Sequence, residues 1–78
     1  MNQLTNLALM APGDSGRITV LTAGLGLVRR LEEIGIRAGQ AVTKVSGMPL
    51  RGPVVVQVGG TRVALGHGMA KKVTVETV

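Results

Sequence analysis

Residues 17–36 read RITVLTAGLGLVRRLEEIGI and combine three features that decide the fold of this chain. Residues Arg17–Ala23 alternate, with Ile18, Val20 and Thr22 on one face, which is typical of a strand. A Gly-Leu-Gly turn follows, and apolar residues then recur every three or four positions, as on the buried face of a helix of about three turns. The stretch therefore predicts a strand, a sharp corner and a short helix.

The end of this helix has a recognisable local sequence. The helix is predicted to begin at Leu25 and to end with the letters EIGI. Gly35 has no Cβ atom, so it can adopt the left-handed conformation of a C′ residue without strain. Ile36 would then be the apolar C″ residue of a Schellman motif. We therefore expect the chain to leave the helix at Gly35.

The Gly24–Gly26 turn lies between a predicted strand and a predicted helix, as does the phosphate-binding turn of dinucleotide-binding proteins. That fingerprint requires a third glycine, where this chain has Arg29, and an acidic residue about 20 positions on, where it has Lys44 and Val45. One helix between two strands also cannot form a doubly wound sheet. We therefore interpret the two glycines as a corner of the chain, with no bound nucleotide.

The remaining sequence predicts four more strands, at Gln40–Ser46, 54–58, 61–65 and 71–78, the last with Val73 and Val75 pointing inward. Gly59 and Gly60 join two of these strands, and a type I′ turn would need positive φ at both. Residues 47–53 contain two prolines and two glycines and are expected to form a loop, and residues 66–70 a short turn or a single helical turn. Five short strands can close into a small barrel without leaving a long exposed edge.

Length and composition indicate a single small domain over residues 1–78, with no room for a large catalytic cleft. A chain of this size buries only about 60% of its unfolded surface. Hydrophobic residues make up 45% of the chain and none is aromatic, so the core must be aliphatic. Residues 1–12 are expected to be a leader segment that packs on the barrel. A secretory signal would have basic residues before its apolar patch, and this segment has none, so we interpret it as part of the mature protein.

The residue types that perform catalysis or bind metals are scarce. His67 is the single histidine, there is no cysteine, and the adjacent Glu32 and Glu33 would diverge by about 100° on a helix. Ser15 and Ser46 lie at turns, without a second group that would complete a triad. We therefore predict no catalytic residue, no cofactor and no metal site, and we interpret His67 as a surface residue.

The formal charge of +5 favours anionic partners such as nucleic acid, acidic protein patches or lipid headgroups. Against nucleic acid, the chain has no aromatic side chain on which bases stack, and its one predicted helix mixes arginine with glutamate. No segment approaches the roughly 20 apolar residues of a membrane-spanning helix. The sequence predicts a cytoplasmic protein that neither binds nucleic acid nor inserts into a membrane.

Two places combine exposed arginine with local apolar residues, as in a modest protein-contact patch. Arg29 and Arg30 lie on the predicted helix, and Met48, Leu50 and Arg51 lie in the predicted loop at 47–53. These five residues are the predicted partner-binding set.

Taken together, the stretches RRLEEIGIRAGQAVTKV, PLRGPVVVQVGGTRVAL and MAKKVTV resemble the FeoA family of small proteins that accompany the FeoB ferrous-iron transporter. The resemblance covers residues 13–76 and rests on the order and spacing of short elements: Arg30-Leu31, Gly35-Ile36, Gly39, Gly52-Pro53, Gly60, Val63-Ala64-Leu65, Ala70 and Val73 to Val75. The sequence departs from the commoner pattern at Met69, where a polar or charged residue often stands before the alanine.

The resemblance implies a mainly β, SH3-like barrel with one short helix between its first two strands. It also implies a non-enzymatic cytoplasmic protein of ferrous iron transport that binds FeoB, an inner-membrane transporter, and modulates its activity or assembly. The alternatives are an SH3-like interaction or nucleic-acid-binding module, a domain like the C-terminal domain of DtxR-type repressors, and a metal-responsive module. The oligomeric state does not follow from the sequence.

Overall fold

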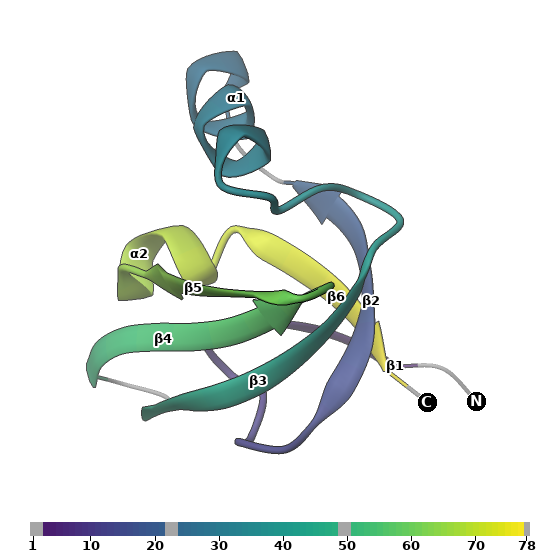
Figure 1. Cartoon of the computed structure of the whole chain (residues 1–78), viewed down its shortest axis with the longest axis vertical. Coiled ribbons are helices and arrows are strands. Elements are labelled where there is room, and N and C mark those ends of the chain that lie inside the picture. Colours follow the sequence, from purple (N-terminus) through teal and green to yellow (C-terminus); the bar gives the residue numbers. More distant parts are fainter. Residues whose placement is uncertain (1–2, 22–23, 49–50, 78) are drawn as a thin grey trace.

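The computed structural model describes residues 3–21, 24–48 and 51–77, which form a mainly β barrel with two short helices. The elements in chain order are β1 (Gln3–Asn6), β2 (Ser15–Leu21), α1 (Leu25–Glu33), β3 (Ala41–Met48), β4 (Arg51–Val58), β5 (Thr61–Leu65), α2 (His67–Ala70) and β6 (Val73–Thr77). The strands form one antiparallel sheet in the order β1-β6-β2-β3-β4-β5, which curls around the core (Figure 1). The last strand thus lies between the first two.

The core consists of aliphatic side chains from alternate positions of these strands. Val73 and Val75 are fully buried, which confirms the predicted inward face of β6. Further buried residues come from the other strands and from the segment after β1: Leu7, Ala8, Met10, Ile18, Val42, Val54, Val56 and Leu65. Branched side chains suit this arrangement because they pack well on a pleated surface.

Helix α1 ends as its sequence predicts. The amide of Gly35 donates to the carbonyl of Glu32 at 3.1 Å, and the amide of Ile36 donates to that of Leu31 at 2.8 Å. These two bonds define a Schellman motif, and Gly35 has the expected positive φ of 98°. Ile36 and Leu31 are both fully buried, so the motif joins the helix end to the core.

The number of strands differs from the sequence prediction, because Gln3–Asn6 forms a sixth strand. This segment pairs with β6 in the register Gln3↔Thr77 to Asn6↔Thr74. Its four residues, QLTN, have no strong strand pattern, so the strand is stabilised by pairing with a distant part of the chain.

Two turns also differ from the predictions. The loop expected at 47–53 is shorter, because β3 extends to Met48 and β4 begins at Arg51. Gly47 and Gly52 have positive φ, and the register shifts near Gly47, so bulges accommodate these glycines within the strands, and Pro53 lies in β4. Between β4 and β5 only the first turn glycine, Gly59, has positive φ, as in a type II′ rather than a type I′ turn. Of the two alternatives for residues 66–70, the structure has the helical one, α2, with Gly66 as its N-cap.

Candidate interaction surfaces

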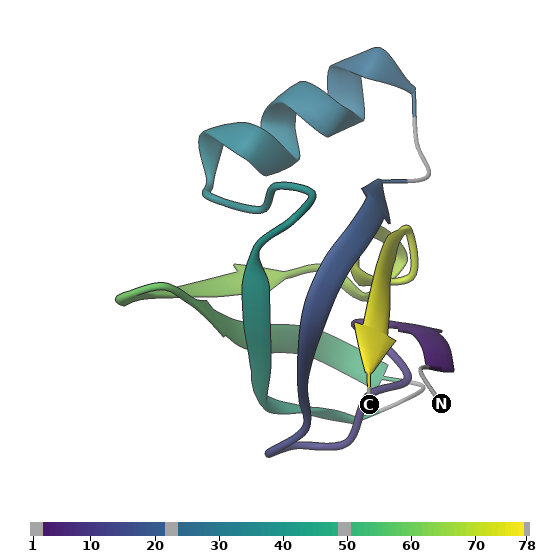
Figure 2. The same ribbon diagram turned by 90° about the vertical axis from the view of Figure 1, so that its right-hand side faces the viewer.

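Helix α1 provides the first candidate surface. Both figures of the whole chain show it beyond the end of the barrel where β2 ends and β3 begins (Figures 1 and 2). Leu31 is its buried residue and Leu27 packs against the core, whereas Leu25 and Ile34 are exposed. The helix therefore contacts the barrel along one narrow stripe and leaves most of its surface to solvent.

Arg29 and Arg30 are both exposed on this helix, as predicted from the sequence. Arg30 lies in the last turn, where a positive charge interacts favourably with the helix dipole. The helix has no acidic residue in its first turn, and Glu32 and Glu33 are exposed near its end. α1 thus presents guanidinium and carboxylate groups together with two exposed apolar side chains.

The other predicted contact residues lie elsewhere. Met48 and Arg51 are paired in register at the end of the β3–β4 ladder, and Leu50 lies outside the described residues. In both views this end of the barrel is far from α1 (Figures 1 and 2). The structure therefore does not bring the two predicted groups into one patch, and their contact with a partner stays a prediction.

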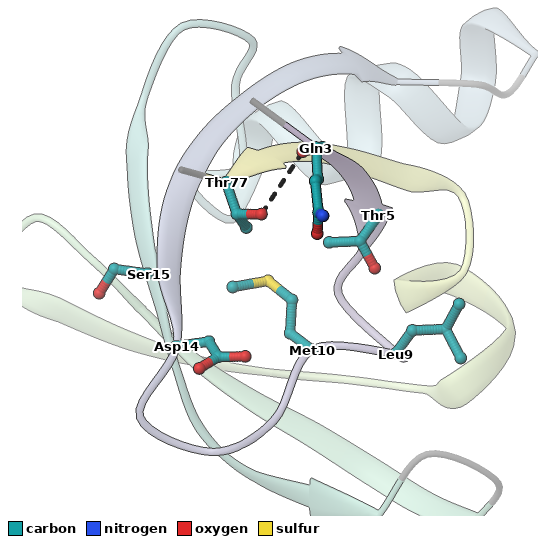
Figure 3. Close-up of a pocket in the computed structure, with 7 residues that line it drawn as sticks. All are labelled: Gln3, Thr5, Leu9, Met10, Asp14, Ser15 and Thr77. Atoms are coloured by element: carbon teal, nitrogen blue, oxygen red, sulfur yellow. Dashed lines mark hydrogen bonds between the residues drawn. The ribbon is translucent and has the colours of Figure 1, made fainter. Parts of the chain in front are cut away.

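A pocket of about 320 Å³ lies beside β1, at the end of the barrel where β6 finishes (Figure 3). Four of its lining residues carry hydroxyl or amide groups, one carries a carboxylate and two are apolar: Gln3, Thr5, Ser15, Thr77, Asp14, Leu9 and Met10. Met10 is buried and lies near the centre of the group, and the carboxylate of Asp14 points toward it (Figure 3). The pocket was not predicted, because its residues come from both ends of the sequence.

Lys44 underlies the segment that forms one wall of this pocket. Its side chain is 0% exposed, and its ammonium Nζ donates a hydrogen bond to the carbonyl of Ala8 at 3.0 Å. The backbone of Lys44 also accepts from the amide of Gly13 at 2.8 Å and donates to the carbonyl of Asp14 at 2.9 Å. One residue of β3 thus forms hydrogen bonds with both ends of the 8–14 segment.

The environment of Lys44 changes its proton affinity. Burial lowers the pKa of the Lys44 ammonium from its usual range, because the charged form loses hydration, and the negative charge of Asp14 opposes part of this change. The sequence contained a signal for this burial, since Lys44 shares a strand face with Val42.

His67 lies at the start of a helix and apart from any cluster of potential metal ligands in the described part of the chain. His67 begins α2 and is half-buried rather than on the open surface, and its Nδ1 is buried without a protein hydrogen-bond partner. Among residues 3–21, 24–48 and 51–77, no three histidine, cysteine or carboxylate side chains gather into a potential metal site. None of the described helices is long and apolar enough to cross a membrane.

Comparison with known proteins identifies the family. The model of the FeoA domain matches residues 5–77, almost the whole chain. The chain belongs to the FeoA domain family. A relative from Methanocaldococcus jannaschii, which carries the provisional name Fe(2+) transport protein A, is 31% identical over 70 residues, covering 90% of this chain and 83% of the relative.

Solved structures of FeoA proteins have the same fold. The crystal structure of an iron uptake regulatory protein, FeoA, matches with a TM-score of 0.90 at 30% identity and covers 97% of this chain and 100% of its own. FeoA of Stenotrophomonas maltophilia, described as an SH3 domain protein in complex with zinc, matches with a TM-score of 0.72 at 36% identity over 91% of this chain and 88% of its own. The SH3-like fold and the FeoA resemblance inferred from the sequence are therefore confirmed.

Proposed function

We propose that this FeoA protein is a non-enzymatic cytoplasmic accessory of ferrous iron transport that binds a FeoB-like transporter and modulates its activity or assembly. Membership of the FeoA family is the observation that carries the proposal. The name of the M. jannaschii relative and the scarcity of catalytic residue types support it.

The α1 surface is the contact that we assign to this partner. Arg29 and Arg30 are exposed donors that can bind carboxylates in a bidentate manner, and Leu25 and Ile34 add exposed apolar area. Interfaces are enriched in arginine beside desolvated apolar groups, so this combination suits a docking surface of modest size. Because α1 contacts the barrel along one stripe, a partner can cover it without disturbing the core.

The test is an NMR titration of the labelled protein with the cytosolic domain of FeoB, with and without a guanine nucleotide. We expect the amide signals of α1 to shift and the double variant Arg29→Ala, Arg30→Ala to bind at least about tenfold more weakly. The matched control is the double variant Lys71→Ala, Lys72→Ala, which removes two exposed charges that follow α2. Absence of shifts at millimolar FeoB domain, or equal weakening by both double variants, would refute docking through α1.

A further inference from the structure

β1 is a short edge strand without the charge, proline or bulge that protects many edge strands. β1 lies at one end of the sheet order, and within the described residues it pairs with β6 alone. Edge strands are usually protected by short length, lysine, proline, a bulge or a covering segment, because their free N–H and C=O groups attract other strands. β1 has the first of these features, with four residues. The residues of β1, QLTN, include no charge and no proline, and their register with β6 is continuous.

Two exposed leucines flank this edge. Leu4, in β1 itself, is 69% exposed, and Leu9, in the segment that follows, is 60% exposed. Leu9 lines the pocket beside β1, whereas Leu4 does not. Side chains of a strand alternate between its two faces, so Leu4 points away from the face that carries Gln3 and Thr5. An added strand would therefore find apolar area on both sides of β1.

The pocket occupies the inner face of the same edge strand. Thr5 pairs with the buried Val75, and Gln3 pairs with Thr77, so both point to the core side of the sheet. Gln3 and Thr5 therefore give the pocket wall on this strand its amide and hydroxyl groups. The hydroxyl of Thr77 donates to the carbonyl of Gln3 at 3.4 Å and closes one side of this cavity (Figure 3).

The groups around the pocket favour a positively charged side chain with an apolar stem. Asp14 is the one ionisable residue in its lining, and the amide and hydroxyl groups supply further acceptor oxygens. Oδ2 of Asp14 accepts one hydrogen bond, from the amide of Ala11 at 3.2 Å. The buried ammonium of Lys44 donates to Ala8 and does not line the pocket, although the charge of Asp14 also acts on it. Met10 and Leu9 can contact the methylene groups of a lysine or arginine.

We propose that β1 and this pocket bind an extended segment of another protein, which adds to the sheet as a strand and places a lysine or arginine side chain beside Asp14. In strand addition, backbone hydrogen bonds supply affinity and pockets for alternate side chains supply specificity. Charge complementarity with Asp14 selects the basic residue. This site lies on a different part of the molecule from α1 and does not depend on the proposed function.

The test uses synthetic heptapeptides of alternating threonine and valine with a variable central residue. We expect the peptide with central lysine to shift the amides of residues 3–6 and 9–15 saturably, and the peptides with central norleucine or glutamate to bind about tenfold more weakly or not at all. N-methylation of alternate peptide amides should abolish binding, since it blocks pairing with an edge strand. The norleucine comparison needs no protein variant.

The matched protein variants are Asp14→Asn and Glu33→Gln. Asparagine can still accept from the amide of Ala11, so Asp14→Asn removes mainly the charge and should weaken binding of the lysine peptide about tenfold. Glu33→Gln removes an exposed carboxylate of α1 and should have no effect. Equal binding of the lysine and norleucine peptides, or no shifts at millimolar peptide, would overturn the proposal. Self-association of the chain through the β1 amides without peptide binding would also overturn it, in favour of a second copy as the occupant.

Discussion

Lys44 offers a direct test of the packing described above, through the substitutions Lys44→Ala and Lys44→Met. Its side chain is 0% exposed, so its methylene groups are packed as core atoms although it carries a charge. Both variants remove the hydrogen bond to the carbonyl of Ala8 and the cost of burying an ammonium group. They differ in the stem, because methionine keeps a chain of similar length and alanine does not.

The expected magnitude follows from this difference. Replacing lysine by alanine removes three buried methylene groups, each worth about 0.8 kcal/mol, which gives about 2.4 kcal/mol. The free energy of unfolding of Lys44→Ala should therefore be about 2 to 2.5 kcal/mol lower than that of Lys44→Met. In a domain of this size the melting temperatures should differ by roughly 10 °C or more.

Urea unfolding followed by circular dichroism measures this difference. The exposed Lys71 provides the control, since Lys71→Ala and Lys71→Met should agree within about 0.5 kcal/mol. If Lys44→Ala and Lys44→Met were equally stable, the stem of the Lys44 side chain would not be packed in the core as described.

Two further predictions concern pH and glycine. Because burial lowers the pKa of Lys44, the unfolded chain binds more protons than the folded one between the folded-state pKa and 10.5, so this group makes the protein more stable as the pH rises through that window. The free energy of unfolding of the natural protein minus that of Lys44→Met should therefore increase between neutral pH and 10.5. A decrease over this range would contradict the prediction. A Cβ at Gly16 would lie 2.5 Å from Cγ1 of Val75 and 2.6 Å from the carbonyl oxygen of Glu76, so Gly16→Ala should destabilise by at least about 2 kcal/mol. A Cβ at Gly26 meets nothing within 4 Å, so Gly26→Ala in α1 should stabilise by about 0.5–1 kcal/mol, and equal urea midpoints for the two variants would count against both statements.

Features set by neighbouring residues could be predicted from the sequence. The end of α1 depends on Gly35 and Ile36, which act within one turn of the helix, and its two hydrogen bonds are those expected. The position of the hairpin at Gly59 and Gly60 could be predicted, but its turn type could not, because glycine adopts either sign of φ and a Gly-Gly pair therefore suits both type I′ and type II′ turns.

Features set by distant residues could not be predicted in the same way. β1 forms because Gln3–Asn6 meets β6, some 70 positions away, and nothing within those four residues signals that pairing. The burial of Lys44 depends on a carbonyl at Ala8, 36 positions earlier. The alternation that places Lys44 on the same face as Val42 favours a buried side chain, whereas its charge favours an exposed one. The carbonyl of Ala8 accepts a hydrogen bond from the ammonium and so allows the side chain to be buried.

The candidate site shows the same division. Exposure of Arg29 and Arg30 followed from the helical periodicity, whereas their separation from Met48 and Arg51 depends on the three-dimensional arrangement of the strands. The pocket beside β1 combines residues between 3 and 15 with Thr77, so no local sequence pattern predicts it.

The position of β6 between β1 and β2 has a consequence for the order of folding. Neither of these early strands can find that partner until residues 73–77 are available, because both pair with β6. When remote segments pair, the chain loses the entropy of closing a long loop before the new contacts stabilise it, and this slows folding. The hairpins from β3 to β5 are local and can form first. We therefore expect the two ends of the chain to join the sheet late, with the last strand closing the barrel.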